Sequence, residues 1–195
     1  MRTPFYTLLL ALVLTLGQSA CAGKDTPKGL TPVKDFKADQ YLGIWYEIAR
    51  LDHSFERGLQ QVTATYSKRE DGGLKVINRG YNVEKQQWEE AEGKAYFVDG
   101  ADTGKLKVSF FGPFYGAYNI IVLDKVNYNF ALVAGPDRDY LWILSRSPQL
   151  PFPVKAELVA RAQALGFDTS KLIYVDQLGP AATKIPHSDT MRDKD

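Results

Sequence analysis

The side chains that could carry acid–base, metal or nucleophilic chemistry are few and scattered in this chain. Histidine occurs only at positions 53 and 187, too few and too far apart for a metal cluster. Glu89, Glu90 and Glu92 could supply a carboxylate pair for general acid–base catalysis, but a solvated strand and turn is the simpler interpretation. No serine lies in a G-x-S-x-G elbow. The sequence therefore predicts a protein that is not an enzyme, with no metal site and no cofactor.

The single cysteine, Cys21, follows a segment with the features of an export signal. Arg2 gives a positive start, residues 5–16 are almost wholly apolar, and Ser19 and Ala20 are small. An apolar run of this length is too short to span a bilayer. A lone cysteine cannot form an intramolecular disulfide. We therefore expect residues 1–20 to be a signal peptide and the thiol to have another use.

The stretch "QSAC" that ends at Cys21 resembles a bacterial lipobox, although Gln18 replaces the leucine favoured at that position. The resemblance implies that Cys21 is acylated and becomes the new N-terminus, with acyl chains that anchor it stably. The alternative is cleavage nearby, which would leave Cys21 as a free thiol. Ala22, in place of an aspartate, resembles proteins sorted to the outer membrane. We expect a lipid-anchored protein on the periplasmic face of that membrane.

About 175 residues remain after cleavage, a length that suits one domain. The chain has 24 basic and 23 acidic residues and no dense basic run, which argues against nucleic acid as a partner. Residues 21–35 are expected to be the lipidated N-terminus and a Gly- and Pro-rich tether. Residues 36–178 would form the domain, and residues 179–195 a polar tail.

Short runs of strand composition alternate with turn formers such as Gly72-Gly73 through most of this domain. The spacing predicts eight strands, at 45–51, 60–68, 74–81, 89–98, 105–111, 117–123, 130–134 and 140–146. The period then changes to three or four residues over 154–165, which predicts one amphipathic helix that ends at Gly166. A last short strand at 172–175 is expected to pair near the first.

Eight sequential strands can close into a barrel, so the predicted fold is all-β: an eight-stranded up-and-down antiparallel barrel with a C-terminal α-helix packed outside. Such a barrel needs a plug at one end. Trp45, just inside the first strand, is the candidate plug, and Gly43 would let the chain turn below it without a clashing β-carbon. Arg146 ends the last strand, which closure brings beside the first. Its guanidinium would then cover the indole in a cation–π contact.

At these residues the chain resembles the lipocalins, and within them the bacterial outer-membrane lipoprotein branch, which is similar to apolipoprotein D. The resemblance covers residues 36–177. Gly43-x-Trp45 matches the first family motif, and Arg146 in "WILSR" matches the third. The second motif is only partly kept, since Asp124 in "VLDKV" stands between a leucine and a lysine.

The resemblance assigns the ligand cavity residue by residue. The positions that it implies are Tyr66, Asn78, Phe110, Tyr118 and Trp142. Strand alternation adds Leu144, which points inward if Arg146 does, while Leu141 and Ile143 point outward and need cover from the helix. His53 in "LDHSFERG" is expected on a mobile loop at the barrel mouth. Aromatic walls with a few hydroxyl and amide groups suit a fatty acid or lysophospholipid.

These patterns predict a membrane-anchored protein that binds lipids and stores or transports them in the bacterial cell envelope. The alternative is a non-catalytic module for partner binding or assembly, in which the aromatic rings merely fill the barrel. An enzyme on this scaffold would lack a recognisable catalytic set. The sequence leaves a homodimer open.

Overall fold

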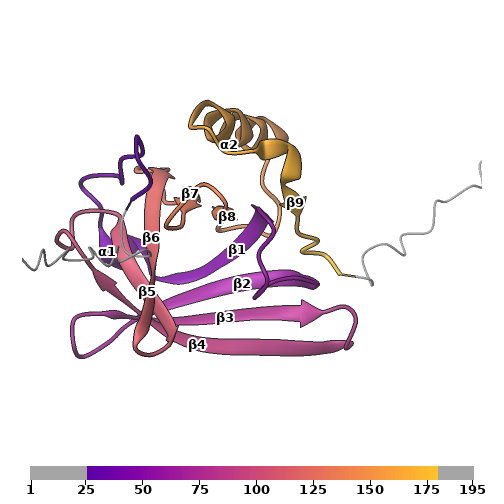
Figure 1. Cartoon of the computed structure of the whole chain (residues 1–195), viewed down its shortest axis with the longest axis horizontal. Helices are drawn as coiled ribbons and strands as arrows, with labels where there is room; N and C mark the ends of the chain where they lie inside the picture. Colours follow the sequence, from indigo (N-terminus) through magenta and orange to yellow (C-terminus); the bar gives the residue numbers. More distant parts are fainter. Residues whose placement is uncertain (1–25, 180–195) are drawn as a thin grey trace, which may run out of the picture.

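The computed structural model describes residues 26–179. Eight strands in sequence order are followed by a helix and a ninth short strand (Figure 1). The elements are α1 (Ala38–Tyr41), β1 (Gly43–Arg50), β2 (Leu59–Lys68), β3 (Leu74–Asn82), β4 (Gln87–Phe97), β5 (Lys105–Phe111), β6 (Phe114–Leu123), β7 (Phe130–Ala134), β8 (Leu141–Ser145), α2 (Phe152–Ala164), the 3₁₀ turn η1 (Thr169–Lys171) and β9 (Ile173–Tyr174).

The strands close into a barrel because β1 pairs with both β2 and β8. Every neighbouring pair is antiparallel. Trp45 lies opposite Ala64 of β2, and Glu47 lies opposite Leu144 of β8. The predicted all-β fold, an eight-stranded antiparallel barrel with a helix after it, is thereby confirmed, with strand ends that shift by up to three residues.

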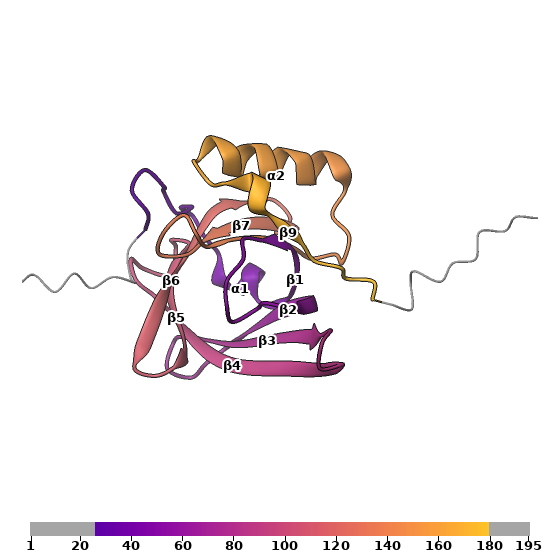
Figure 2. The same cartoon turned by 45° about the vertical axis from the view of Figure 1, so that its right-hand side comes forward.

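The up-and-down order gives the barrel two different ends. We call the end that carries the β1–β2, β3–β4, β5–β6 and β7–β8 loops the mouth, and the opposite end the floor. At the floor, α1 lies within the ring of strands (Figure 2). This helix was not predicted from the sequence. Its last residue, Tyr41, is buried against the rings of Trp45 and Tyr66.

Two apolar cores follow from the alternation of the strands. The interior core includes Trp45, Leu74, Ile120 and Leu144, and the outer core lies between the barrel wall and α2. Leu141 and Ile143 of β8 belong to the outer core, as alternation predicts, together with Leu158 and Ala162 of α2. The helix therefore covers the apolar outer face of the barrel (Figures 1 and 2).

The C-terminal segment closes a gap between β1 and β2 on the mouth side. The two strands pair only from Gly43 to Tyr46 of β1, and further on β9 pairs with Ala49 and Arg50 instead. The Gln177 side-chain amide donates to the carbonyl oxygens of Glu47 and Val62, at 2.7 and 2.8 Å. The predicted pairing of the last strand near the first is thus present, and Gln177 extends it.

Residues 26–35 pack on the barrel, although they were expected to belong to the tether. Leu30 is buried in the outer core, and the backbone N–H of Val33 donates to the carbonyl oxygen of Ile120. Apolar residues within a Gly- and Pro-rich stretch explain the difference, since burial outweighs its flexible composition. The signal peptide, Cys21 and the tail after residue 179 lie outside the described residues. Neither helix within residues 26–179 is long and apolar enough to cross a membrane.

Candidate functional site

The floor of the barrel is built around Trp45. Its ring is fully buried, and the Arg146 guanidinium carbon lies 4.0 Å from the ring centroid, which is the contact predicted from the sequence. The same guanidinium donates to the carbonyl oxygens of Ile44 (2.7 Å), Gln40 (2.8 Å) and Tyr128 (3.3 Å). The indole N–H donates to the carbonyl oxygen of Tyr41 at 2.8 Å. Arg146 therefore ties β1, α1 and the β6–β7 loop together.

Gly43 is required for its backbone conformation rather than for space. Its φ is +92°, a backbone conformation that residues with a β-carbon rarely adopt. A β-carbon at this position would lie 3.5 Å from the Arg146 Nη1 atom, which is an ordinary contact. The sequence hypothesis named steric clearance as the reason, and the structure replaces it with the left-handed φ.

The structure brings the predicted lining residues together inside the barrel. Tyr66 and Leu144 are members of the interior core, and Phe110, Tyr118 and Trp142 pack against it. Phe110 lies over Gly93 of β4, where a β-carbon would approach its ring to 2.8 Å. A bare glycine on one strand thus makes room for a phenylalanine on the next.

Three tyrosine hydroxyls meet in the interior. Tyr118 is hydrogen bonded to Tyr41 at 2.7 Å and to Tyr66 at 2.8 Å. Burial raises the pKa of all three hydroxyls, so they remain protonated donors and acceptors. Tyr66 and Tyr118 were predicted to line the cavity. Tyr41 was missed because it belongs to the unpredicted helix α1.

Asn78 faces the same interior from β3, opposite Ala64 of β2 and Ala91 of β4. Its side-chain carbonyl oxygen is buried and has no hydrogen-bond partner among the described residues. A buried acceptor without a partner carries a desolvation cost that a ligand hydroxyl or amide could relieve. Asn78 therefore remains a candidate polar contact for a ligand.

A buried charged cluster lies on the mouth side of the tyrosines, formed by Glu47, Arg50 and Glu56. The Arg50 guanidinium donates to the Glu47 carboxylate at 2.7 Å and to the carbonyl oxygen of Glu56 at 2.8 Å. The Trp142 indole N–H donates to the Glu56 carboxylate at 3.1 Å. Burial raises the pKa of both carboxyl groups, and for Glu47 the negative charge of Glu56 raises it further.

This cluster was not predicted from the sequence, and only part of it had a sequence signal. Strand alternation places Glu47 on the inward face of β1 together with Trp45. A bulge between Glu47 and Ala49 then shifts the register of β1 against β8, so that Arg50 lies opposite Trp142 and also faces inward. Nothing in the sequence predicts that bulge. The inward position of Glu56 depends on the fold of the β1–β2 loop.

His53 lies on the β1–β2 loop at the mouth, as predicted, but its side chain packs into the barrel opening. The side chain is buried, and its ring stacks on Phe55 at 4.1 Å and lies 5.0 Å from the Trp142 ring. The Nε2 atom is 3.3 Å from a carboxylate oxygen of Glu56. Burial, with the nearby positive charge of Arg50, lowers the pKa of His53 to about 4. The β1–β2 loop thus turns the side chains of His53 and Glu56 inward, while Phe55 stays exposed.

The acidic residues that could have served catalysis are exposed or half-buried. Glu89 pairs with Lys85 at 2.7 Å, and Glu92 pairs with Lys75 at the same distance. Residues 26–179 contain no group of three or more potential metal ligands. These observations match the interpretation of Glu89, Glu90 and Glu92 as a solvated strand and turn.

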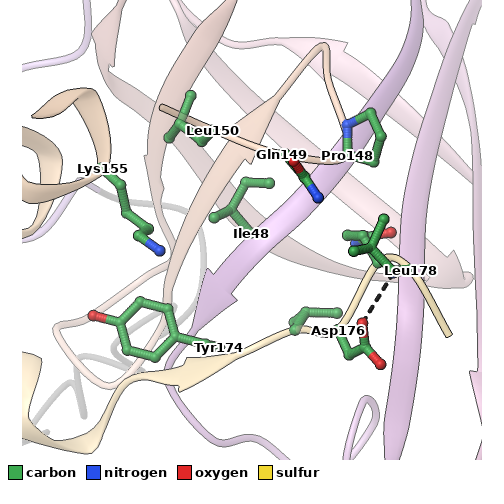
Figure 3. A pocket seen from close by; sticks show the side chains of 10 residues that line it. Ile48, Pro148, Gln149, Leu150, Lys155, Tyr174, Asp176 and Leu178 are labelled. Carbon is green, nitrogen blue, oxygen red and sulfur yellow. Dashed lines mark hydrogen bonds between the residues drawn. The ribbon is translucent and has the colours of Figure 1, made fainter. Parts of the chain in front are cut away.

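One surface groove lies outside the barrel, between the segment that leads to α2 and the C-terminal segment (Figure 3). Its volume is about 310 Å³. Ile48, Leu150, Lys155, Tyr174 and Leu178 are among the residues that line it. Because none of the predicted ligand-binding residues reaches this groove, it is separate from the barrel interior.

A closed eight-stranded antiparallel barrel, with an arginine-capped tryptophan at its floor and a helix outside, defines the class of small ligand-binding barrel proteins. Residues 36–177 match the family model of the Lipocalin-like domain. The chain belongs to the lipocalin family.

Named relatives support this assignment. The chain is 59% identical over 160 residues to the outer membrane lipoprotein Blc of Escherichia coli K12, which covers 82% of this chain and 90% of that protein. Its identity to Blc of Vibrio cholerae is 55% over 170 residues, covering 87% and 96%. These relatives place the chain among outer-membrane lipoproteins. Rat apolipoprotein D is 33% identical over 180 residues, covering 88% and 92%.

A solved structure with the same fold is insecticyanin from the tobacco hornworm. It has a TM-score of 0.62 and 23% identity, and the match covers 77% of this chain and 86% of that one. This likeness shows the barrel architecture alone.

Proposed function

We propose that this lipocalin binds a fatty acid or lysophospholipid inside its barrel, without catalysis, and stores or transports it in the cell envelope. An anchor at Cys21 would hold the protein on the periplasmic face of the outer membrane. Membership of the lipocalin family supports binding of a small hydrophobic ligand. The acyl chain and the identity of the ligand are the proposed part.

The distribution of polarity inside the barrel is the observation that carries this proposal. The floor half is apolar around Trp45 and Leu74, whereas the buried charges of Glu47, Arg50 and Glu56 lie toward the mouth. An acyl chain that enters tail first would place its methylenes against the apolar half and its polar head near these charges. Asn78 and the tyrosine hydroxyls offer hydrogen bonds between the two ends.

The experiment measures binding of fatty acids and lysophospholipids of increasing chain length to the delipidated full chain, below the critical micelle concentration. We expect saturable changes in tryptophan fluorescence, because Trp142 lies beside the interior core. Burial of each methylene contributes roughly 0.8 kcal/mol before association costs, so a dozen methylenes leave room for micromolar or tighter binding. Affinity should rise with chain length and then level off at the depth of the barrel.

Variants at interior and surface positions test whether the ligand binds inside the barrel. Phe110→Ala removes an interior ring and should weaken binding at least tenfold. Asn78→Ala should cost about 1 kcal/mol, the net contribution of a neutral hydrogen bond. Phe152→Ala, an exposed ring at the start of α2, is the matched control and should bind like the parent protein. Equal losses for the interior and control variants would contradict an interior site.

A filled barrel that serves partner binding or assembly is the second candidate. The mutual hydrogen bonds of Tyr41, Tyr66 and Tyr118 favour it, because these hydroxyls already satisfy one another. A folded, delipidated sample that binds no acyl chain of any length would support this candidate and refute the lipid-binding proposal. Product analysis on the same lipids tests the absence of catalysis.

A further inference from the structure

Large apolar side chains are exposed around the mouth of the barrel, and we call this set the mouth rim: Phe55, Val83, Trp88, Phe111 and Phe114. Phe111 and Phe114 are the most exposed, at 80% and 78%, and they flank the tight β5–β6 turn. Leaving such rings in water is unfavourable, and rings clustered at one end of a molecule mark an interaction site.

The exposed apolar side chains at the floor end are of a different type. Among the described residues, the large exposed apolar side chains at that end are Ile44, Val98 and Val126, none of which is aromatic. Aromatic rings are favoured at the membrane–water interface, because the apolar part of the ring can contact lipid while its edge stays near water. The asymmetry therefore points to the mouth as the end that meets lipid.

The basic side chains on the mouth loops all have local partners. Arg57 pairs with Asp52 at 2.6 Å, and Lys85 pairs with Glu89 at 2.7 Å. The Arg138 guanidinium donates to the carbonyl oxygens of Leu165 and Lys28. Because this surface lacks a concentrated basic patch, its binding to a membrane would not require anionic lipids. Membrane contact through the rim would be apolar, and its strength would be nearly independent of salt concentration.

The start of the described chain lies beside the middle of β6 and close to the β7–β8 loop. The Thr26 hydroxyl donates to the Asn119 side chain at 2.8 Å, and the Asn119 amide donates to the carbonyl oxygen of Gly135, at the start of the β7–β8 loop. Cys21 is five residues before Thr26, so an anchor there can reach at most roughly 18 Å from it. From Asn119 to Phe114, β6 extends over a similar length, about 17 Å.

We propose that the mouth rim docks on a phospholipid bilayer, so that the opening of the barrel faces the membrane to which the chain is anchored. The inference extends the proposed lipid-binding function, since a lipid could then pass between bilayer and barrel without crossing bulk water. The short reach from Cys21 allows the anchor and the rim to meet the same membrane surface.

The test uses the full chain with its anchor, reconstituted into phosphatidylcholine vesicles. Single-cysteine variants Phe111→Cys, Phe114→Cys and Val126→Cys are labelled with an environment-sensitive fluorophore, after mass spectrometry has verified that Cys21 is acylated. Val126 is 82% exposed at the floor end and is the matched control. Labels at the rim should shift to the blue and be quenched by spin-labelled lipids, and raising the salt concentration should leave both effects in place.

The other outcomes each overturn the proposal. Rim labels that stay in water, or a Val126 label that enters the bilayer, would mean that the mouth does not face the membrane. Rim labels that leave water without quenching by lipid would mean that a second copy of the chain covers the rim.

A second measurement separates this inference from the function on which it rests. Phe111→Ser should slow the transfer of a fluorescent fatty acid from protein to vesicles by about tenfold, the effect of removing one inserted ring. Its affinity for the same fatty acid without vesicles should not change, and Val126→Ser should change neither quantity. Unchanged transfer with intact binding would refute docking alone, whereas absent binding in the parent protein would refute the proposed function.

Discussion

His53 shows how burial decides the chemistry of a single residue in this protein. The imidazole is held between aromatic rings at the mouth, where burial and the Arg50 charge disfavour its protonated form. Its pKa is about 4, while a histidine in the unfolded chain titrates near 6.5. Between these values the unfolded state binds the proton more tightly than the folded state.

The contribution of His53 to stability should therefore fall as the pH is lowered from 7 toward 4. The contribution of His53 is fully present above its unfolded pKa, and its loss amounts to up to about 3 kcal/mol at 1.4 kcal/mol per pKa unit. The raised pKa values of Glu47 and Glu56 act in the opposite sense and favour the folded state as the pH falls. Urea unfolding of the parent protein and of His53→Gln at several pH values isolates the histidine, because both proteins keep the two carboxyl groups.

As the pH is lowered over this range, the unfolding free energy of the parent protein should fall relative to that of His53→Gln. If both proteins show the same dependence of unfolding free energy on pH, His53 is not held neutral in the folded state.

At the scale of elements, the C-terminal segment holds together two strands that do not pair along their full length. Gln177 replaces the missing ladder between the mouth halves of β1 and β2 with two hydrogen bonds from one amide. The backbone N–H of Val175 adds a bond to the carbonyl oxygen of Ile48. Segments distant in sequence are joined here because β1 pairs with β2 only as far as Tyr46, which leaves backbone groups to be satisfied.

Gln177→Ala should lower the free energy of unfolding by about 1–3 kcal/mol, since it leaves two partly buried carbonyl oxygens without their donor. The matched control is Gln149→Ala, at an exposed position in the same region. Denaturant unfolding measures both variants. A loss for Gln177→Ala no larger than that of Gln149→Ala would show that the amide bridge is not needed to hold the strands together.

At the scale of the whole molecule, an anchor at Cys21 would hold the barrel within a short distance of the membrane. We expect the parent protein to fractionate with the outer membrane. Cys21→Ser, which cannot be acylated through sulfur, should accumulate as a soluble periplasmic or unprocessed species. Fractionation followed by mass spectrometry of the N-terminal peptide checks both outcomes. A parent protein found soluble and without lipid would contradict the anchor.

The sequence alone was enough to predict the strand order, the helix and the contact between Trp45 and Arg146. These depend on local periodicity, on turn residues between strands, and on the rule that a closed barrel brings its first and last strands together. The outward positions of Leu141 and Ile143 followed from alternation in the same way. Local patterns determine such features because they repeat with a fixed period along the chain.

Tertiary structure decided the features that depend on register and loop folding. The bulge in β1 turns Arg50 inward, the β1–β2 loop buries His53 and Glu56, and α1 adds Tyr41 to the interior. Gln177 bridges strands that are over a hundred residues earlier in the chain. Each of these residues is stabilised by partners that are distant in sequence, so the neighbouring residue types give no local signal for its position. Only the closed barrel determines which of these side chains become buried.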